Sequence, residues 1–218
     1  MRHGVNKYYS YNQKDQSYQK KIVNKSVPYY LFTVILFIVG FISGNVVCYD
    51  LNNQKLLSVI NPVKDTIEVL SVEKSLSLLI KSFFTHFTYI FIIWFLSLTI
   101  IGIILVMFII FFVGFMYGVV ISSFTYQLGF QGLLIGFFYT FPQNVILIPL
   151  LIYISSHSIR LSLAIFKNFF QSSSRKYLKD LLNQYYNQLF FATGILIIYA
   201  LIMSIFGNVF TNILKSLI

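Results

Sequence analysis

Hydrophobic residues fill the middle of the chain without a single charged residue among them. No Asp, Glu, Lys or Arg occurs from Ser82 to Ile159. One helix over this stretch would extend about 117 Å, whereas the hydrocarbon core of a bilayer is about 30 Å thick. Elements of soluble proteins keep one face in water and therefore carry charges more often. The pattern predicts that this segment crosses a membrane more than once.

Two further apolar stretches flank this block. Residues 28–48 are strongly apolar, and their insertion into lipid is favourable by about 4 to 7 kcal/mol. This stretch is longer than the apolar part of a signal peptide and lacks a small-residue cleavage site, so it predicts a retained span. Residues 190–210 predict the last span. Before the first span, residues 1–27 are polar and basic, which predicts a flexible cytoplasmic tail.

Glycines divide the long apolar block. The segment from Gln127 to Gly132 is rich in glycine and glutamine and predicts a turn. Gly102 has apolar residues on both sides, so the sequence does not show whether the chain turns there. Residues 87–126 can therefore be divided in two ways. One has a tight turn at Gly102 and gives three spans in the block, at about 87–101, 103–126 and 133–156. The other has one over-long, tilted span over 87–126 and gives four spans in the whole chain.

The distribution of lysine and arginine decides between these divisions. Residues 160–189 carry five basic residues and one acid, whereas the four lysines of residues 49–86 are balanced by four acids. Cytoplasmic loops attract Lys and Arg, so residues 1–27 and 160–189 should share the inner side, with an even number of spans between them. The sequence therefore predicts an all-α, polytopic integral membrane protein of about five spans. Residues 28–218 form a single membrane domain, with the N-terminus inside and 49–86 outside.

Two polar segments predict short amphipathic helices at the membrane surface. In the connector 49–86, Asn61 and Pro62 provide an N-cap and a first-turn proline for a helix that runs to about Lys81. In the basic segment 160–189, Ser174 precedes apolar residues at helical spacing.

Composition agrees with a membrane protein and limits the alternatives. Of the 218 residues, 57% are hydrophobic and 10% are charged, against about 25% charged in a soluble domain. The net charge of +10 would suit nucleic acid. The basic residues flank the predicted spans, however, where they set orientation, so no nucleic-acid binding is expected. The single cysteine, Cys48, excludes an intrachain disulfide and a cysteine-rich metal site.

Two glycine pairs inside predicted spans follow the GxxxG pattern. They are Gly40 with Gly44, and Gly114 with Gly118. Glycines one turn apart remove side chains from one face and let another helix approach closely. Each pair is therefore a candidate helix contact. The partner helix could belong to the same chain or to a second copy in a homo-oligomer.

The segment Phe141-Pro142-Gln143-Asn144, followed by Pro149, predicts a broken helix. Proline removes a backbone donor and kinks a helix, and polar groups beside such breaks bind solutes in transporters. The two amides can instead bond to neighbouring helices and to freed carbonyls and so fix the packing. The second interpretation is the favoured one. A short re-entrant helix over 132–141 would leave the topology unchanged.

The apolar block offers little chemistry. It holds no carboxylate, which excludes an intramembrane aspartyl protease and a carboxylate proton relay. His86 and His157 lie near predicted span ends, without Cys or carboxylate nearby, so no metal site is predicted. The serines around His157, from Ser155 to Ser158, lack an acid to orient it and are expected to end a span. The sequence predicts no cofactor and no enzymatic activity.

The order of these motifs resembles the stage II sporulation protein M family of bacterial membrane proteins. The resemblance covers about residues 28–160. Its carriers are Gly40 with Gly44, the stretch Ile93 to Gly102, Gly114 with Gly118, Gln127 to Gly132, Phe141 to Asn144, and Ile148 with Pro149.

This resemblance implies a non-catalytic scaffold of the engulfment machinery. Members of the family are similar in holding two peptidoglycan hydrolases, sporulation proteins D and P, at the septal membrane while the mother cell engulfs the forespore. For this chain, the resemblance implies a place in the lipid bilayer of the cytoplasmic and septal membranes and partners that resemble these two hydrolases. The alternative function is a permease subunit of a membrane transporter, on the evidence of the segment Pro142 to Asn144.

Overall fold

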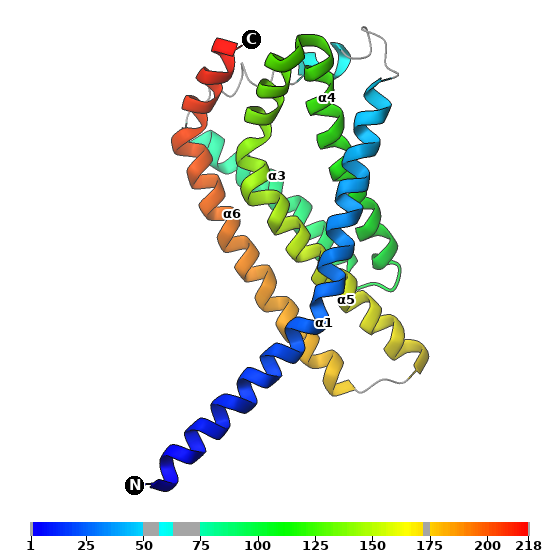
Figure 1. Ribbon diagram of the computed structural model, residues 1–218, viewed down its shortest axis with the longest axis vertical. Helices are drawn as coiled ribbons and strands as arrows, with labels where there is room; N and C mark the ends of the chain where they lie inside the picture. Colours follow the sequence, from blue (N-terminus) through cyan, green and yellow to red (C-terminus); the bar gives the residue numbers. More distant parts are fainter. Residues whose placement is uncertain (1, 50–56, 63–74, 172–174, 218) are drawn as a thin grey trace.

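Every described element of the protein is a helix (Figure 1). The computed structural model describes residues 2–49, 57–62, 75–171 and 175–217, with side chains in 26–49, 57–62, 76–77, 79–138, 145–169 and 179–205. Its elements are α1 (Arg2–Tyr49), a short helix over 57–62, α3 (Ser75–Leu96), α4 (Gly102–Pro142), the π-helix η1 (Gln143–Leu147), α5 (Ile148–Gln171) and α6 (Arg175–Leu217). Five of the helices are long and apolar enough to cross a membrane. The predicted all-α, polytopic fold is confirmed.

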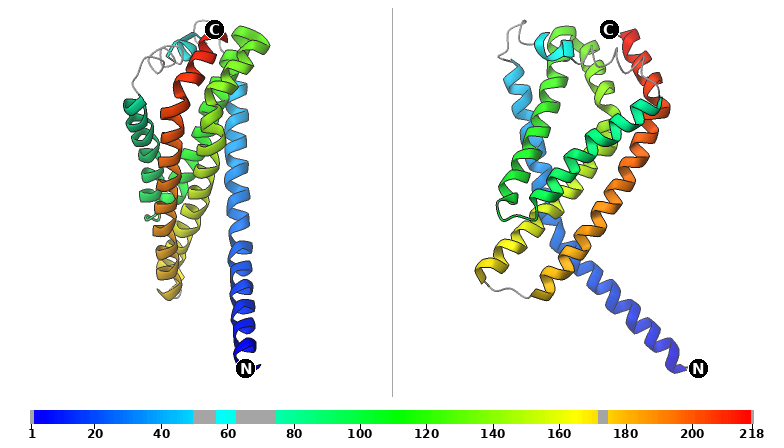
Figure 2. Two further views of the ribbon diagram at one scale, coloured as in Figure 1. Left: turned by 90° about the vertical axis from the view of Figure 1, so that its left-hand side faces the viewer. Right: turned by 180° about the vertical axis from the view of Figure 1, so that it is seen from behind.

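The chain passes five times between the two ends of the bundle (Figures 1 and 2). α1 rises to the upper end, α3 descends, and the first part of α4 rises again. The rest of α4, η1 and α5 then descend together, and α6 rises to the C-terminus. The start of α1, the α3–α4 turn, the end of α5 and the start of α6 therefore lie at the lower end.

Gly129 reverses the chain inside α4. Its φ of 60° and ψ of −137° lie outside the helical region, in backbone space that other residues rarely adopt. A Cβ atom at Gly132 would lie 1.8 Å from the carbonyl oxygen of Phe124, and one at Gly136 would lie 3.1 Å from the Cα of Ile121. In a straight helix, residues 132 and 124 would be about 12 Å apart. The two arms of α4 therefore run antiparallel, and the reversal falls in the glycine- and glutamine-rich segment.

α5 occupies the centre of the bundle. Of its span, 56% is buried, against 11 to 28% for the other four. The spans are Ser26–Tyr49, Leu79–Leu96, Gly102–Phe138, Val145–Phe169 and Lys179–Ile205. The main core gathers buried side chains from α3, α4, α5 and α6, among them Ile90, Ile93, Val106, Leu150, Ile154, Leu196 and Tyr199.

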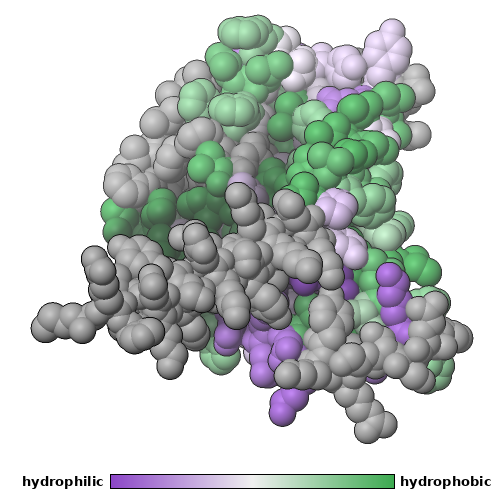
Figure 3. All heavy atoms as spheres, turned by 60° about the horizontal axis from the view of Figure 1, so that its bottom comes forward, coloured by the Kyte–Doolittle hydropathy of each residue, from purple (hydrophilic) through white to green (hydrophobic). Residues whose placement is uncertain are grey.

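The surface of the bundle separates by hydropathy. Figure 3 shows hydrophobic side chains over its sides and hydrophilic side chains gathered toward the lower end. Exposed polar residues of α5 and α6 at this end are Lys167, Lys179, Asp180, Asn183, Gln184 and Asn187. Large exposed hydrophobic side chains on every span suit contact with lipid tails rather than with water.

The predicted flexible tail over 1–27 is wrong, because the backbone is helical from Arg2 onward and continuous with the first span. Figure 2 shows this part of α1 projecting beyond the bundle. Helix propagation adds one hydrogen bond for each residue fixed, so an established span can extend a helix into a polar segment. Pro28 lies inside α1 and does not end it.

The second span lies earlier in the sequence than predicted. α3 begins at Ser75 and ends at Leu96, so residues 97–101, predicted to complete the span, form the turn to α4. The hydroxyls of Ser97 and Thr99 donate to carbonyl oxygens of the last turn of α3, which closes the helix. Gly102 starts α4, and a Cβ atom there would lie 1.9 Å from the carbonyl oxygen of Leu96.

Neither predicted surface helix stands as a separate helix in the described residues. Ser174 lies outside them, but the helix predicted after it is the first part of α6, which continues as one helix to Leu217. Asn61 and Pro62 lie in the helix over 57–62 and not at the start of one. Residues 63–74 of the same prediction lie outside the described residues, and 75–81 belong to α3.

Candidate functional site

The two GxxxG pairs face each other across α1 and α4. The pairs are Gly40 and Gly44 on α1, and Gly114 and Gly118 on α4. A Cβ atom at Gly40 would lie 2.2 Å from the carbonyl oxygen of Phe111, and one at Gly114 would lie 2.3 Å from that of Phe37. The other two glycines meet carbonyl oxygens at 2.2 Å as well. The backbones touch because both helices lack side chains here, and the contact lies within one chain.

Polar side chains continue this contact toward the upper end. The Asn45 side-chain oxygen accepts a hydrogen bond from Ser122 of α4. The Cys48 sulfur lies 3.4 Å from both the carbonyl oxygen of Val119 and the hydroxyl of Ser123. Cys48 is buried as a result. These bonds add directional contacts to a seam that the glycines bring close.

The predicted broken helix coincides with the π-helix η1. α4 ends at Pro142, η1 covers Gln143–Leu147, and Pro149 is the second residue of α5 and is exposed. Leu147 and Leu150 point into the core. The side chains of Pro142, Gln143 and Asn144 lie outside the described ones. The backbone therefore departs from α-helical bonding where the prolines remove donors, about 20 Å along the helix from the reversal at Gly129.

A buried polar seam on α5 is the largest feature that the sequence analysis did not anticipate. The seam comprises Ser155, Ser156, His157, Ser158, Arg160 and Ser162. All except His157 are less than one tenth exposed. The prediction that the serines around His157 end a span is wrong, because α5 continues to Gln171. Other parts of the chain provide partners for His157, Ser158, Arg160 and Ser162, so the helix has no reason to end there.

Tyr185 of α6 joins three helices in one layer of the seam. Its hydroxyl lies 2.7 Å from the hydroxyl of Ser97, which directly follows α3, and 2.6 Å from the hydroxyl of Ser158. Its ring stacks on Trp94, with centroids 5.9 Å apart and planes within 3°. One turn further along α5, Ser162 donates to the carbonyl oxygen of Thr99 at 2.7 Å.

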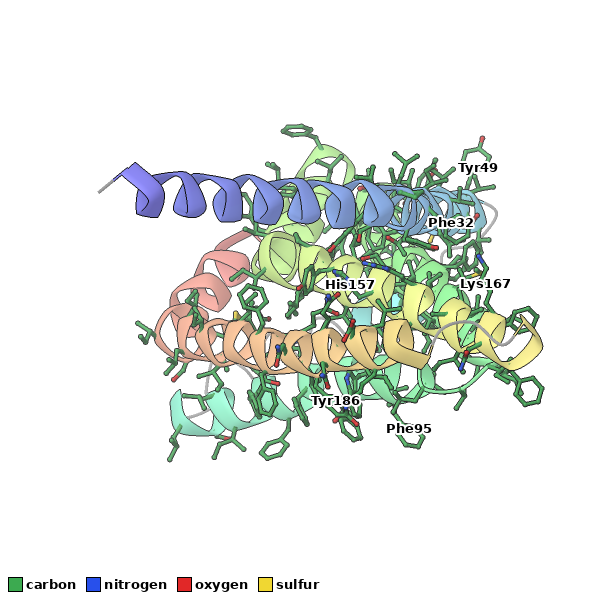
Figure 4. The ribbon with its side chains drawn as sticks, turned by 90° about the horizontal axis from the view of Figure 1, so that it is seen from below. Phe32, Tyr49, Phe95, His157, Lys167 and Tyr186 are labelled. Atoms are coloured by element: carbon green, nitrogen blue, oxygen red, sulfur yellow. The ribbon has the colours of Figure 1, made fainter. Side chains whose placement is uncertain are left out.

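His157 joins a different set of helices. Its Nε2 lies 2.7 Å from the hydroxyl of Tyr30 on α1, and its Nδ1 lies 3.0 Å from the amide nitrogen of Gln188 on α6. Figure 4 shows His157 in the interior, between α1 and α6, whereas Phe95 and Tyr186 lie on the periphery. Both ring nitrogens of His157 therefore have partners, and the imidazole ties α1 and α6 to α5.

Among the described residues, this arrangement pairs polar side chains of different helices. The polar seam consists of hydroxyls, one imidazole and one guanidinium, and no described carboxylate contacts it. An activated nucleophile needs a base that a third group orients, and the partners of His157 are a phenol and an amide. Within the described ranges, no group of His, Cys, Asp or Glu could hold a metal ion.

One signal for the seam was present in the sequence. Ser155, Ser158 and Ser162 recur at intervals of three and four, which places them on one side of a helix. A helix with hydroxyls on one side inside an apolar block needs partners on that side. The identity of the partners, Tyr30 and Tyr185 among them, depends on residues far away in the chain.

Comparison with known proteins identifies the family. The family model described as Stage II sporulation protein M matches residues 33–211, which covers all five spans apart from the start of the first. No curated protein and no solved structure matches the chain. The matched range includes both glycine pairs, the reversal at Gly129, η1 and the polar seam. The chain is an integral membrane protein that belongs to the stage II sporulation protein M family.

Proposed function

We propose that the protein is a non-catalytic membrane scaffold of the engulfment machinery that anchors peptidoglycan hydrolases at the septal membrane. The hydrolases would resemble sporulation proteins D and P. The observation that carries this proposal is that the polar side chains inside the bundle form hydrogen bonds between helices. Most of their hydroxyls, the His157 imidazole and the amide nitrogen of Gln188 bond to one another and to backbone carbonyls, so they serve to position helices.

The shape of the molecule is compatible with this role. Among the described residues, little lies outside the bundle apart from the projecting part of α1 and the short helix over 57–62. The outer faces of the spans expose large apolar and aromatic side chains, which a membrane anchor of a partner can contact. A rigid bundle with such faces suits the holding of other membrane proteins in one place.

Affinity purification from sporulating cells tests the proposal. The full-length tagged protein, solubilised in mild detergent, should recover the two hydrolases. As a matched pair, Gly114→Ala should weaken recovery because it separates α1 from α4, whereas Gly194→Ala, whose Cβ meets nothing within 4 Å, should not. A deletion strain should form the septum and fail to engulf the smaller compartment. Clean recovery of an ATPase without the hydrolases would overturn the proposal.

A second candidate function is a permease subunit, favoured by the position of η1. π-helical turns occur often at functional sites, and this one lies directly after Pro142 inside the membrane-spanning part of the chain. This candidate predicts that Asn144→Ala abolishes transport of a solute in vesicles while the protein remains folded. If Asn144→Ala abolishes transport and leaves engulfment unchanged, the protein acts as a transporter. If the variant loses engulfment but still binds the hydrolases, both proposed functions are contradicted.

A further inference from the structure

Arg160 is a buried cation without an acid. Its side chain is 7% exposed and lies within the span Val145–Phe169. Its Nη1 donates to the hydroxyl of Ser26 at 2.9 Å, and among the described residues it has no carboxylate partner. A guanidinium carries five N–H donors, so this bond satisfies a small part of it. Burial of a charge without a counter-charge is costly, and charged side chains within spans therefore pair with an opposite charge or with backbone carbonyls.

The acids of the chain are poorly placed to supply that anion. Asp15 precedes Ser26 on α1 by about 16 Å of helix. Asp180 is exposed on α6 and makes no ion pair with Arg160. All other acids belong to residues 50–74, which come in the sequence after Tyr49, and Tyr49 lies about 35 Å along α1 from Ser26. No carboxylate among the described side chains supplies the counter-charge, which points to an anion from outside the chain.

The position of Arg160 relative to the membrane boundary indicates where an anion could come from. Ser26, its hydrogen-bond partner, follows the polar and basic first part of α1 and directly precedes its apolar stretch. Ser162, two residues further along α5, bonds to Thr99 in the turn between two spans. A turn between spans lies at the membrane boundary, so Arg160 lies near headgroup depth. Lys167, two turns further along α5, is exposed at the polar lower end of the bundle (Figures 3 and 4).

We propose that Arg160 binds the phosphate of an anionic phospholipid headgroup at the crossing of α1 and α5. A guanidinium presents paired N–H donors that match phosphate oxygens, and it sheds water more readily than an ammonium. Ser26 accepts one hydrogen bond from the guanidinium, and Tyr30 lies one turn further along α1. The bound lipid would bridge α1 to α5 and so fix the point where α1 leaves the bundle.

Lipid titration of the purified full-length protein tests this site. The midpoint of thermal unfolding is measured in neutral detergent while phosphatidylglycerol or phosphatidylcholine is added. Phosphatidylglycerol should raise the midpoint with saturation, and phosphatidylcholine should not. Equal shifts with the two lipids would overturn the proposal. A shift of the same size with inorganic phosphate alone would overturn the lipid as the source of the phosphate.

Substitutions on α5 test whether Arg160 is the ligand. Arg160→Gln removes the charge and keeps donors, and it should weaken phosphatidylglycerol binding at least tenfold. Lys167→Gln removes an exposed charge two turns away and should change the affinity less than twofold. Arg160→Lys keeps the charge without the paired donors and should bind several-fold more weakly, which supplies a folded variant if Arg160→Gln does not fold. Equal loss in the Arg160→Lys and Lys167→Gln variants would overturn the assignment.

Discussion

At the scale of single residues, hydrogen bonds inside the membrane connect side chains of different helices. The Tyr185 hydroxyl of α6 lies 2.7 Å from that of Ser97, in the α3–α4 turn, and 2.6 Å from that of Ser158 on α5. A polar group left alone in hydrocarbon is costly, so such groups favour the one arrangement that pairs them. The polar seam of α5 therefore selects neighbours rather than reactants.

Tyr185→Phe tests this at one hydroxyl. The substitution removes two hydrogen bonds and keeps the ring that stacks on Trp94. Each such bond contributes about 0.6 to 1.7 kcal/mol in a membrane protein, so the free energy of unfolding in detergent should fall by about 1 to 3 kcal/mol. Tyr186→Phe alters the exposed neighbour and should leave it unchanged. Equal effects of the two substitutions would contradict the role of the seam.

Gly114→Ala tests the backbone contact between α1 and α4. The added methyl group would meet the carbonyl oxygen of Phe37 at 2.3 Å, so the helices must separate. Overpacking of this kind typically costs about 1 to 3 kcal/mol of unfolding free energy. Gly194→Ala makes the same change where nothing lies within 4 Å, and it should be neutral or slightly stabilising. Denaturant-induced unfolding in detergent measures both.

At the scale of the element, the positions where helices end depend on hydrogen-bond partners and close contacts, and not on local polarity. α5 runs through its serines and α1 extends into a polar segment, whereas α3 ends in an apolar stretch at Leu96. The α3 end is fixed by Ser97 and Thr99, which bond back to its carbonyls, and by the close approach of Gly102. Geometry of the connection, rather than hydropathy, sets this boundary.

Gly129→Ala tests the other tight connection. A Cβ atom at Gly129 would meet nothing within 4 Å, so any loss arises from the backbone conformation and not from packing. Such a conformation costs about 1 to 3 kcal/mol for a residue with a side chain. We expect a lower unfolding midpoint, and we expect the loss to exceed that of Gly194→Ala. A loss no larger than the control would mean that the two arms of α4 do not depend on this reversal.

At the scale of the whole molecule, the basic segments lie together. The projecting part of α1, the end of α5 and the start of α6 share the lower end of the bundle (Figure 1). Lysine and arginine accumulate on the cytoplasmic side of membrane proteins, so we predict that the lower end faces the cytoplasm. The predicted outside location of residues 49–86 and the predicted inside N-terminus follow from this orientation.

Thiol labelling of intact cells checks the orientation. Tyr49 at the upper end and Lys167 at the lower end are both exposed, whereas the native Cys48 is buried and contributes little background. A membrane-impermeant reagent should label Tyr49→Cys in intact cells and Lys167→Cys only after permeabilisation. The reverse pattern would place the lower end outside and contradict the charge argument.

The sequence by itself determined the membrane setting, the five crossings and the family resemblance. Each depends on a segment and its solvent: a charge-free stretch partitions into lipid wherever it lies in the fold, and glycine at 129 permits a reversal whatever packs beside it. The positions of lysine and arginine gave the number of crossings, because each basic segment prefers the cytoplasmic side whatever the rest of the chain does. These features need no knowledge of contacts between distant residues.

Only the tertiary structure decided what the polar residues and the glycines meet. The sequence around Gly40 and Gly114 shows a GxxxG pattern but does not show which helix each glycine meets. Likewise, the sequence around Ser158 does not show that its hydroxyl is paired with Tyr185. The same holds for Arg160, whose bond to Ser26 joins residues 134 positions apart in the sequence. A hydrogen bond or a close contact needs two residues, and residues far apart in the sequence meet only when the chain folds.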